Sequence, residues 1–534
     1  MKLTKKAVKG MLVLLCIFCL CMGSCMRVKA SPSEKFSFYE DGDVVGFIGD
    51  SITHAIYTPV NYVNVLSLYY LSRFPQQEVE FRNLGAAGYK ISDVLNIYDQ
   101  DPAFRGINKA VIMLGTNEAI LGISSEDYIS NMEKLIERLK EDGLKEEDIL
   151  ILSPPICDQN CSLNYGSSGK PRWTYESRLL EYMDMLKIKT TEWGVGYLDI
   201  HTPMAELTEE IQKEDRSNTL TTDCIHPNTT GQMLIAYYIL QLQGAGDEPL
   251  SGIFVPEDGG AQAVHGELTD FYRGERGICW TFKSETLPVA ATAELLKFQS
   301  FLESAGILYE ETLQIKGLSE DIFYTVYMGE TELGTFSGRD LADGIDLAAL
   351  ENHPMQMSMQ QIDDWSRKRH QEVVEYRNIW VEIAMQRAVY EPDPIQSEYE
   401  KWRTADEELR NMMYATAQDM ADSIFHLSVI EEGYSVEELE QDKKEAEEQA
   451  KKEAEEQASR EAEEQAKREA EEQAKREAEE QAKRKAEQEA EEAQRAAEEK
   501  AERELFMRKI LIGTGVSVIG VLVVLTVIQR KRNI

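Results

Sequence analysis

Short apolar runs alternate with longer amphipathic stretches between residues 40 and 245 of this 534-residue chain. Four of the apolar runs have the length and composition of buried strands: Val44–Ile48, Ala110–Leu114, Ile149–Leu152 and Gly196–Ile200. The stretches between them, including Asp127–Lys140 and Trp173–Trp193, have a helical period. Such alternation predicts an α/β domain over residues 31–245, with a mostly parallel sheet covered by helices on both faces. Functional residues are then expected in the loops that follow the strands.

Residues 250–350 have a different pattern and are predicted to form a small β-containing region. Leu313–Ile315 and Ile322–Tyr327 are typical of strands. The turn residues Gly329-Glu330 would pair the second of these with Glu332–Phe336 as a hairpin.

A helical pattern returns at Gln356 and continues to about Val429. Pro392 and Pro394 interrupt it, because proline removes a backbone donor and clashes with the preceding turn. We therefore predict a helical hairpin over residues 351–433.

The composition changes abruptly after Gly433. Ser435-Val436-Glu437-Glu438 is a capping box, which marks a helix start, and the octad Glu-Ala-Glu-Glu-Gln-Ala-Lys-Arg then repeats with near identity. Alanine recurs every four residues, so an apolar stripe drifts by about 40° per step and leaves no continuous coiled-coil seam. Glutamate stands four residues before lysine or arginine throughout, which supports a lone helix. Residues 435–508 are predicted to form a single charged helical stalk on the order of 110 Å long; disorder and a loose oligomeric coiled coil are the alternatives.

Both ends of the chain have membrane-related patterns. A lysine-rich start, the apolar run Met11–Met22 and the small-residue site Val28-Lys29-Ala30 predict a signal peptide over residues 1–30. A membrane anchor and a lipoprotein site at Cys25 are the alternatives there. Ile510–Ile528 is uncharged and spans roughly 28 Å as a helix, which predicts a transmembrane helix over 510–528. The basic residues that follow favour a cytoplasmic tail over 529–534. The expected arrangement is a single-pass type I protein of the cell membrane with its catalytic domain outside.

The net charge of −38 argues against a nucleic-acid partner, which requires a basic face. Four cysteines lie outside the signal peptide: Cys157, Cys161, Cys224 and Cys279. An exported chain permits disulfides, and Cys157 with Cys161 is the favoured pair because one loop carries both; buried free thiols are the alternative. Their spacing is not that of metal ligands, and no metal or cofactor is expected.

The candidate chemistry begins with Ser51, in Gly49-Asp50-Ser51 directly after the first predicted strand. A serine hydroxyl becomes a good nucleophile only when a base takes its proton and a carboxylate orients that base. Of the seven histidines, only His226 has a suitable neighbour, in Asp223-Cys224-Ile225-His226-Pro227. Asp223 and His226 are close enough in sequence for one loop to carry both.

Acyl transfer also needs hydrogen-bond donors for the oxyanion. Gly88, at the end of Asn83–Gly88, offers an unobstructed backbone N–H, and Asn117, in Gly115-Thr116-Asn117-Glu118, offers a side-chain amide. Each loop alone could be an ordinary turn. All of them follow strand signals in one α/β pattern, which indicates a common site.

These blocks together resemble the SGNH (GDSL) hydrolase family of serine esterases. Gly49-Asp50-Ser51 is similar to its nucleophile block, Gly88 to its glycine block, Gly115-Thr116-Asn117 to its asparagine block and Asp223-x-x-His226-Pro227 to its acid–base block. The resemblance covers residues 43–243 and implies a flavodoxin-like three-layer fold without a cofactor. It extends more loosely to a branch of the family with an appended C-terminal region.

The resemblance also implies the roles of the site residues. Ser51 would attack the acyl carbon, with His226 as base oriented by Asp223, and the oxyanion would be held by Ser51 N–H, Gly88 N–H and the Asn117 amide. The chain departs from the family pattern at Glu118, where aspartate is usual, and at Ala87-Gly88-Tyr89, which replaces the commoner Ser-Gly-Asp/Asn. Neither departure removes a named catalytic group, but both bear on the hydrogen bonds of the site loops.

The expected function is that of a cell-surface serine esterase. It would hydrolyse small acyl esters, above all O-acetyl groups of a carbohydrate or cell-wall polymer, through an acyl-serine intermediate. A lysophospholipase or thioesterase acting on longer acyl chains is one alternative, and a tethered binding or structural protein with a relict hydrolase site is another. The expected partners are the small ester or acylated carbohydrate and, through the C-terminal helix, the membrane.

Overall fold

The computed structural model describes residues 36–55, 58–165, 169–246, 248–302, 305, 308–385, 392–421 and 423–530. Within its helices, the side chains of residues 373–375, 377–385, 392–395, 398 and 512–530 are not described. The chain divides into two compact units, Met1–Glu440 and Gln441–Ile534. The predicted signal peptide, residues 1–30, lies outside the described residues.

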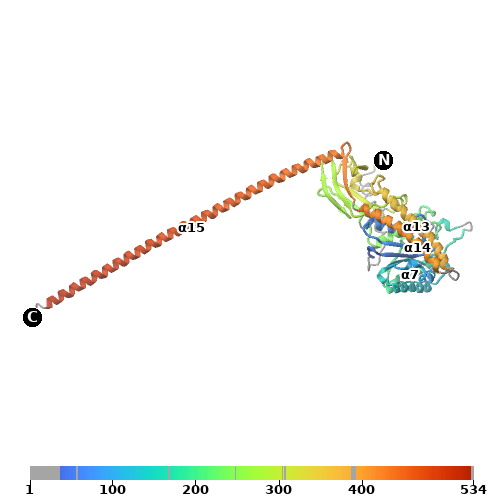
Figure 1. Cartoon of the computed structure of the whole chain (residues 1–534), viewed down its shortest axis with the longest axis horizontal. Helices are drawn as coiled ribbons and strands as arrows, with labels where there is room; N and C mark the ends of the chain where they lie inside the picture. Colours follow the sequence, from blue (N-terminus) through green and yellow to red (C-terminus); the bar gives the residue numbers. More distant parts are fainter. Residues whose placement is uncertain are drawn as a thin grey trace, which may run out of the picture. The chain divides into compact units, whose positions relative to one another are not determined.

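The first part of unit one is built on a five-stranded parallel sheet (Figure 1). Its strands, in spatial order, are β2 (Glu80–Asn83), β1 (Val44–Gly49), β3 (Lys109–Met113), β4 (Ile149–Leu152) and β5 (Gly196–Leu198). This order, 2-1-3-4-5, is that of flavodoxin-like folds. The predicted strands and the mostly parallel α/β sheet are therefore confirmed.

Successive residues of the central strands face opposite sides of the sheet, so each side has its own apolar core. Phe47 and Val111 pack in one core, whereas Ile48 and Ile112 pack in the other. The first core is covered by α3 (Tyr62–Arg73), α8 (His201–Gln212) and α9 (Thr229–Leu242). The second is covered by α4 (Ile91–Ile97), α5 (Thr116–Leu121), α6 (Ser125–Glu141) and α7 (Glu176–Trp193). The result is the expected three-layer arrangement.

The region after this domain holds two further sheets that share one apolar core. The four-stranded sheet contains, in spatial order, β13 (Ile345–Asp346), β10 (Glu311–Ile315), β6 (Ser251–Val255) and β7 (Gln262–Val264). The five-stranded sheet contains β12 (Thr331–Ser337), β11 (Phe323–Met328), β14 (Ile424–Glu431), β9 (Gly277–Ser284) and β8 (Gly266–Arg273). Short helices α10 (Ala293–Phe301) and α12 (Gly338–Asp343) accompany them, and 3₁₀ turns elsewhere in the unit lie at Pro102–Phe104, Glu146–Asp148 and Ser162–Asn164. The predicted hairpin after residue 322 is confirmed, because β11 and β12 pair antiparallel.

One sequence prediction in this region is wrong. Helix was expected up to about Val429, yet residues 424–431 form strand β14, which lies between β11 and β9 and pairs antiparallel with both. Leu427 and Val429 on this strand are fully buried in the core that the two sheets share. Pairing on both sides satisfies the backbone hydrogen-bonding groups of this short segment, and the burial of its side chains outweighs a weak local preference for helix.

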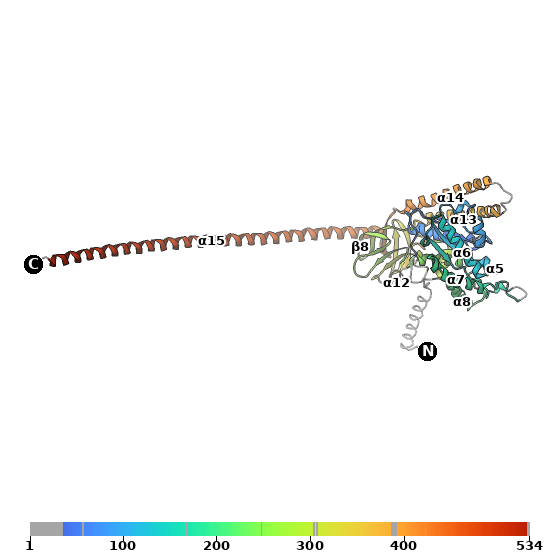
Figure 2. The ribbon, with the colours of Figure 1, turned by 90° about the horizontal axis from the view of Figure 1, so that it is seen from below.

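Two long helices, α13 (Gln356–Met385) and α14 (Pro392–Ala421), lie side by side as the predicted hairpin (Figure 2). The hairpin packs on the edge of the parallel sheet. Arg369 of α13 donates to the carbonyl of Phe81 in β2 at 3.1 Å, and Tyr414 of α14 donates to the carbonyl of Val79 at 2.7 Å. An exposed strand edge is open to unwanted pairing, so this contact protects β2.

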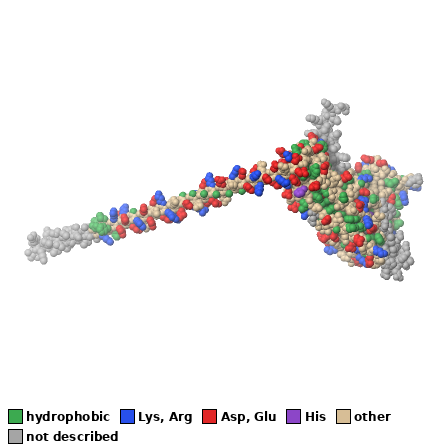
Figure 3. Space-filling view, turned by 45° about the horizontal axis from the view of Figure 1, so that its top comes forward, with side chains coloured by type: hydrophobic (Ala, Val, Ile, Leu, Met, Phe, Trp, Pro, Cys, Tyr) green, Lys and Arg blue, Asp and Glu red, His purple; other side chains and the backbone are tan. Residues whose placement is uncertain are grey.

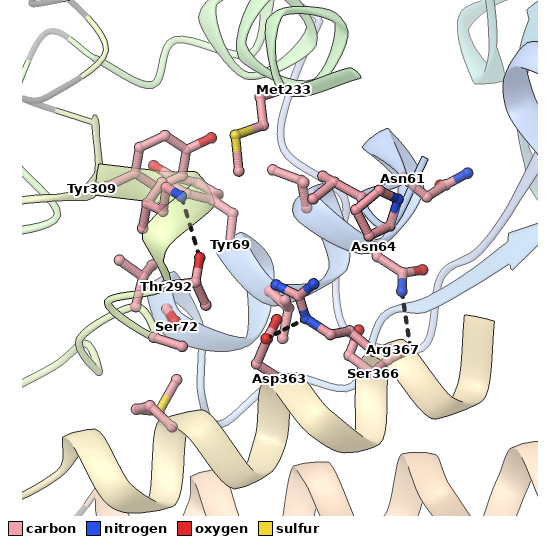
Figure 4. Close-up of a pocket in the computed structure, with 18 residues that line it drawn as sticks. Asn61, Asn64, Tyr69, Ser72, Met233, Thr292, Tyr309, Asp363, Ser366 and Arg367 are labelled. Carbon is pink, nitrogen blue, oxygen red and sulfur yellow. Dashed lines mark hydrogen bonds and ion pairs between the residues drawn. The ribbon is translucent and has the colours of Figure 1, made fainter. Parts of the chain in front are cut away.

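A cavity of about 70 Å³ remains where α13 meets α3 and α9, and it is lined mainly by apolar side chains (Figure 4). Two polar contacts lie beside it, and the second of them bridges two helices. Asp363 pairs with Arg367 at 2.6 Å within α13, and the Asn64 amide of α3 donates to the Ser366 carbonyl at 2.9 Å. The appended hairpin is thus joined to the α/β domain by both apolar packing and hydrogen bonds.

The four cysteines outside the predicted signal peptide are all buried, and none of them forms a disulfide. The favoured pairing of Cys157 with Cys161 is therefore wrong, and the alternative of buried thiols holds. The Cys157 thiol instead contacts Tyr175, and Cys161 contacts Cys224. Burial raises the pKa of Cys157 to about 12, so this thiol is unreactive at neutral pH.

The second unit consists of α15 (Val436–Arg530), which begins within the last residues of the first unit. The capping box is confirmed: Ser435 N–H donates to Glu438 Oε2 at 2.9 Å, and Glu438 N–H donates to Ser435 Oγ at 3.3 Å. Side chains from Lys444 to Leu511 are all exposed, and charges of both signs follow one another along the helix (Figure 3). The expected pairs form, for example Glu472 with Arg476 at 2.7 Å.

Among the residues whose side chains are described, no helix is long and apolar enough to cross a membrane. The predicted span, residues 510–528, continues α15 as backbone, but its side chains from residue 512 onward are outside the described set. The transmembrane helix therefore stays a prediction.

Candidate active site

Ser51 lies at a sharp turn between β1 and the one-turn helix α2 (Ser51–His54). The Asp50 carboxylate caps this helix by accepting the N–H of Ile52 at 2.9 Å. A Cβ on Gly49 would lie only 2.0 Å from a side-chain oxygen of α2, so glycine is required for the close approach. The turn places the serine at the carboxyl edge of the sheet, where such folds bind ligands.

The three predicted triad residues form one hydrogen-bonded chain. Ser51 Oγ lies 2.9 Å from His226 Nε2, and His226 Nδ1 lies 2.9 Å from Asp223 Oδ2. Asp223 Oδ1 also accepts the backbone N–H of His226 at 2.9 Å. Partial burial raises the pKa of Asp223, but the hydrogen bonds from His226 outweigh it and lower this pKa to about 2. Asp223 is thus a carboxylate at neutral pH and can orient an imidazole and stabilise its protonated form.

The loop that carries Asp223 and His226 is closed by its own backbone. Thr222 N–H donates to the His226 carbonyl at 2.8 Å, and Cys224 adopts a left-handed conformation with φ of 76°. Two residues after His226, the Asn228 side chain caps α9 by accepting the Gly231 N–H at 3.0 Å. These contacts hold the acid and the base three residues apart on one rigid turn.

The segments that carry the two predicted oxyanion donors contact each other at this edge of the sheet. The Asn117 amide donates to the Tyr89 carbonyl at 2.9 Å and lies 3.5 Å from Asp50 Oδ2, directly beside the nucleophile. Gly88, which precedes Tyr89, has a left-handed φ of 77°, and no heavy atom lies within 4 Å of where its Cβ would be. Open space therefore remains beside Gly88, in the loop that the Asn117 amide contacts.

Residues 47–234 match the model of the GDSL-like Lipase/Acylhydrolase family. These residues form a GDSL-like lipase/acylhydrolase domain. The protein is accordingly an ester hydrolase of the serine type. No curated protein matches the chain.

Solved structures with this fold include a gut microbial diltiazem-metabolizing enzyme, which is 19% identical with a TM-score of 0.63. That similarity covers 74% of this chain and 98% of the other, so it extends beyond the GDSL domain into the appended region. Axe2, an acetylxylan esterase from Geobacillus stearothermophilus, is 18% identical with a TM-score of 0.32, over 40% of this chain and 97% of its own. A lipolytic G-D-S-L protein from Veillonella parvula is 21% identical with a TM-score of 0.29, over 37% and 96%.

Two buried acidic groups of the GDSL domain lie beside the nucleophile and were not predicted as parts of the site. Burial raises the pKa of Asp50 to about 6, against the effects of the Ile52 N–H and His226. Burial also raises the pKa of Glu118 to about 7, and the nearby Asp50 contributes in the same direction. In the sequence, Glu118 stood out only as a departure from the family pattern. Its position next to Asn117 was the one signal that could have placed it in the site.

A residue from the appended helical hairpin also contacts the GDSL domain next to the candidate site. His370 of α13 is buried next to His54, the last residue of α2, and hydrogen-bonds to the backbone of Ala55. Burial, together with His54, lowers the pKa of His370 to about 4. The appended hairpin therefore packs against the helix that begins with Ser51. No sequence signal could have paired residues so far apart in the chain.

Proposed function

We propose that the GDSL domain hydrolyses small acyl esters, above all O-acetyl groups of a carbohydrate or cell-wall polymer, through an acyl-serine intermediate. The observation that carries the proposal is the unbroken hydrogen-bonded chain from Ser51 through His226 to Asp223, with both distances at 2.9 Å. The preference for short acyl groups rests on the family and on the predicted external location, where acylated polymers are accessible.

In the first half-reaction, Ser51 Oγ attacks the acyl carbon while His226 Nε2 takes the hydroxyl proton. The tetrahedral oxyanion accepts hydrogen bonds from Ser51 N–H, Gly88 N–H and the Asn117 amide. As the intermediate collapses, His226 returns the proton to the departing alcohol oxygen, and the acyl group stays on Ser51. Asp223 keeps the imidazole oriented and balances its transient positive charge.

In the second half-reaction, His226 takes a proton from water, whose oxygen attacks the acyl-serine carbonyl. The same donors hold the second oxyanion, and His226 then protonates Ser51 Oγ as the carboxylic acid leaves. Every proton moves through one imidazole, so the site needs no additional acid or base.

The deciding experiment compares p-nitrophenyl acetate, octanoate and palmitate with the wild-type protein and Ser51→Ala. We expect the highest kcat/KM with acetate and a loss of about 10³-fold or more in the variant. Release of acetate from an O-acetylated polysaccharide, measured in parallel, tests the carbohydrate preference. A clear preference for palmitate would favour the lysophospholipase or thioesterase alternative. Equal hydrolysis by both proteins would support the tethered binding protein.

We further propose that the protein is a single-pass type I membrane protein whose catalytic unit lies outside the cell. The lysine-rich, apolar start of the chain and the uncharged run of residues 510–528 support this arrangement. Deleting residues 510–534 is expected to release the active esterase into the culture medium. Retention of the truncated protein inside or on the cell would contradict the proposed anchor.

A further inference from the structure

The two departures from the family pattern stand in two segments that contact each other, the start of α5 and the loop that leads into α4. Asn117 and Glu118 are neighbours at the start of α5, and both side chains reach the loop of residues 88–91. The Asn117 amide donates to the Tyr89 carbonyl at 2.9 Å, and Ile91 N–H donates to Glu118 Oε1 at 2.7 Å. One helix turn thus holds the same loop at two points.

Glu118 is an expensive group to bury. Its residue is 2% exposed, and Oε2 has no hydrogen-bond partner among the described residues. Burying a carboxyl that is only half satisfied costs free energy. The hydrogen bond that Glu118 Oε1 accepts from Ile91 N–H is therefore the contact that offsets part of this cost.

The Gly88 N–H depends on such anchors for its direction. Open space lies on the side of Gly88 where a Cβ would stand. The loop is instead held by hydrogen bonds of the neighbouring residues, such as that from Tyr89 N–H to the Ala86 carbonyl at 3.2 Å. On one side, Ala86 N–H donates to the Gly49 carbonyl at 3.1 Å. On the other side, the loop is held where Ile91 bonds to Glu118.

We propose that Glu118 is a positioning residue for the oxyanion pocket: by holding the Ile91 N–H it fixes the 88–91 loop so that Gly88 N–H and the Asn117 amide converge on one oxygen. This inference rests on the proposed esterase function. Asn117 then has two roles, as an oxyanion donor and as a residue that holds the loop through the Tyr89 carbonyl. Glu118 holds the same loop through Ile91, from the same helix.

The kinetic test compares Glu118→Ala, which removes the acceptor, with Glu118→Gln, which keeps an amide oxygen for Ile91. With p-nitrophenyl acetate, we expect kcat of Glu118→Ala to fall about 10-fold or more while KM changes by less than about 3-fold, because the lost interaction matters in the transition state. Glu118→Gln is expected to keep kcat within about 3-fold of the wild type. Equal losses in both variants, or a loss that lies only in KM, would overturn the proposal.

Asp101→Ala is the matched control. Asp101 is 1% exposed and also accepts a backbone N–H, that of Ala103 at 3.0 Å, but it lies before the amino end of β3, away from the site. Its removal should lower the thermal midpoint and leave kcat unchanged. A fall in kcat equal to that of Glu118→Ala would show a general effect of destabilisation and contradict a positioning role.

A second measurement does not depend on catalysis. In the full-length protein, hydrogen–deuterium exchange of a peptide over residues 88–98 should be faster in Glu118→Ala than in the wild type, and unchanged in Glu118→Gln. Unaltered exchange in Glu118→Ala would overturn the proposal even if the enzyme is active. Absence of any Ser51-dependent hydrolysis would instead refute the proposed function, and the exchange result would still decide whether Glu118 fixes the loop.

Discussion

At the scale of single residues, Asp223 offers the sharpest test of the hydrogen-bonded chain. Asp223→Asn keeps the size of the side chain but presents a neutral amide to His226 Nδ1, which no longer favours the tautomer that accepts the serine proton. We expect kcat to fall by about 10⁴-fold with little change in KM, as loss of the carboxylate does in other triads. Steady-state kinetics with p-nitrophenyl acetate measures both constants.

The pH dependence of this site follows from the same carboxylate. Because its pKa is lowered to about 2, Asp223 stays ionised well below neutral pH. The stability that this carboxylate contributes is complete above the pKa of the unfolded chain, near 4, and is lost only as the pH falls through about 2. Protonation of Asp223 should therefore produce no acidic limb in kcat/KM above about pH 4, measured with p-nitrophenyl acetate. An acidic limb near pH 4 that disappears in Asp223→Asn would contradict the lowered pKa of Asp223.

The site residues that could be predicted from the sequence are those carried by short local patterns. Ser51 stands in the turn after β1, at the carboxyl edge of the sheet. Asp223 and His226 share the loop between α8 and α9, which meets Ser51 at that edge. The roles of Glu118 and His370 could not be predicted, because each depends on a partner set by the tertiary fold. Glu118 meets Ile91 from another helix, and His370 comes from beyond the GDSL domain.

At the scale of elements, the contact between the helical hairpin and β2 depends on one buried carboxylate. Glu80 accepts from three arginines: Arg82 at 2.8 Å, Arg403 at 3.1 Å and Arg410 at 2.6 Å. Burial raises the pKa of Glu80, but Arg82 and Arg410 outweigh it and lower the pKa to about 2. Because this carboxylate is ionised in the folded state, its contribution is complete above its unfolded pKa of about 4 and is lost as the pH falls toward 2.

Glu80→Ala is expected to lower the free energy of unfolding by about 2–4 kcal/mol, since it leaves a buried arginine without its counter-ion. Urea unfolding of the full-length protein at pH 7 measures the change. The control is Glu320→Ala, which removes an exposed partner of Arg339 and should cost less than about 1 kcal/mol. Equal effects of the two substitutions would show that the Glu80 cluster does not hold the hairpin in place.

The elements themselves were predictable where local pattern and burial agree. The buried runs of β1, β3 and β4 are recognisable by their apolar composition, since both faces of a parallel sheet are covered. β14 was missed because it returns after the hairpin to fill the centre of an antiparallel sheet, and only its distant partners in β9 and β11 make it a strand. The docking of α13 and α14 on β2 likewise depends on contacts far apart in sequence.

At the scale of the whole molecule, the sequence repeat predicts how the stalk behaves alone. Every side chain from Lys444 to Leu511 is exposed on α15, and pairs such as Glu464 with Arg468 at 2.5 Å recur along it. Each pair contributes about 0.2–0.5 kcal/mol, and many in series sustain a helix that has no packing partner. A peptide of residues 435–508 should therefore be strongly helical by circular dichroism and monomeric by sedimentation, with helicity that falls as salt screens the pairs.

The control peptide replaces Arg468, Arg476 and Arg484 with glutamate. It removes three favourable pairs and creates like-charge neighbours four residues apart, so helicity should fall while the peptide stays monomeric. A coiled coil would behave differently, because its helicity and mass would rise together with peptide concentration. The drifting alanine stripe offers no seam for such association, and each octad lengthens the helix without adding to a continuous apolar face. Monomeric behaviour of both peptides, with lower helicity in the control, would identify the stalk as a charge-paired spacer whose reach is set by the number of repeats.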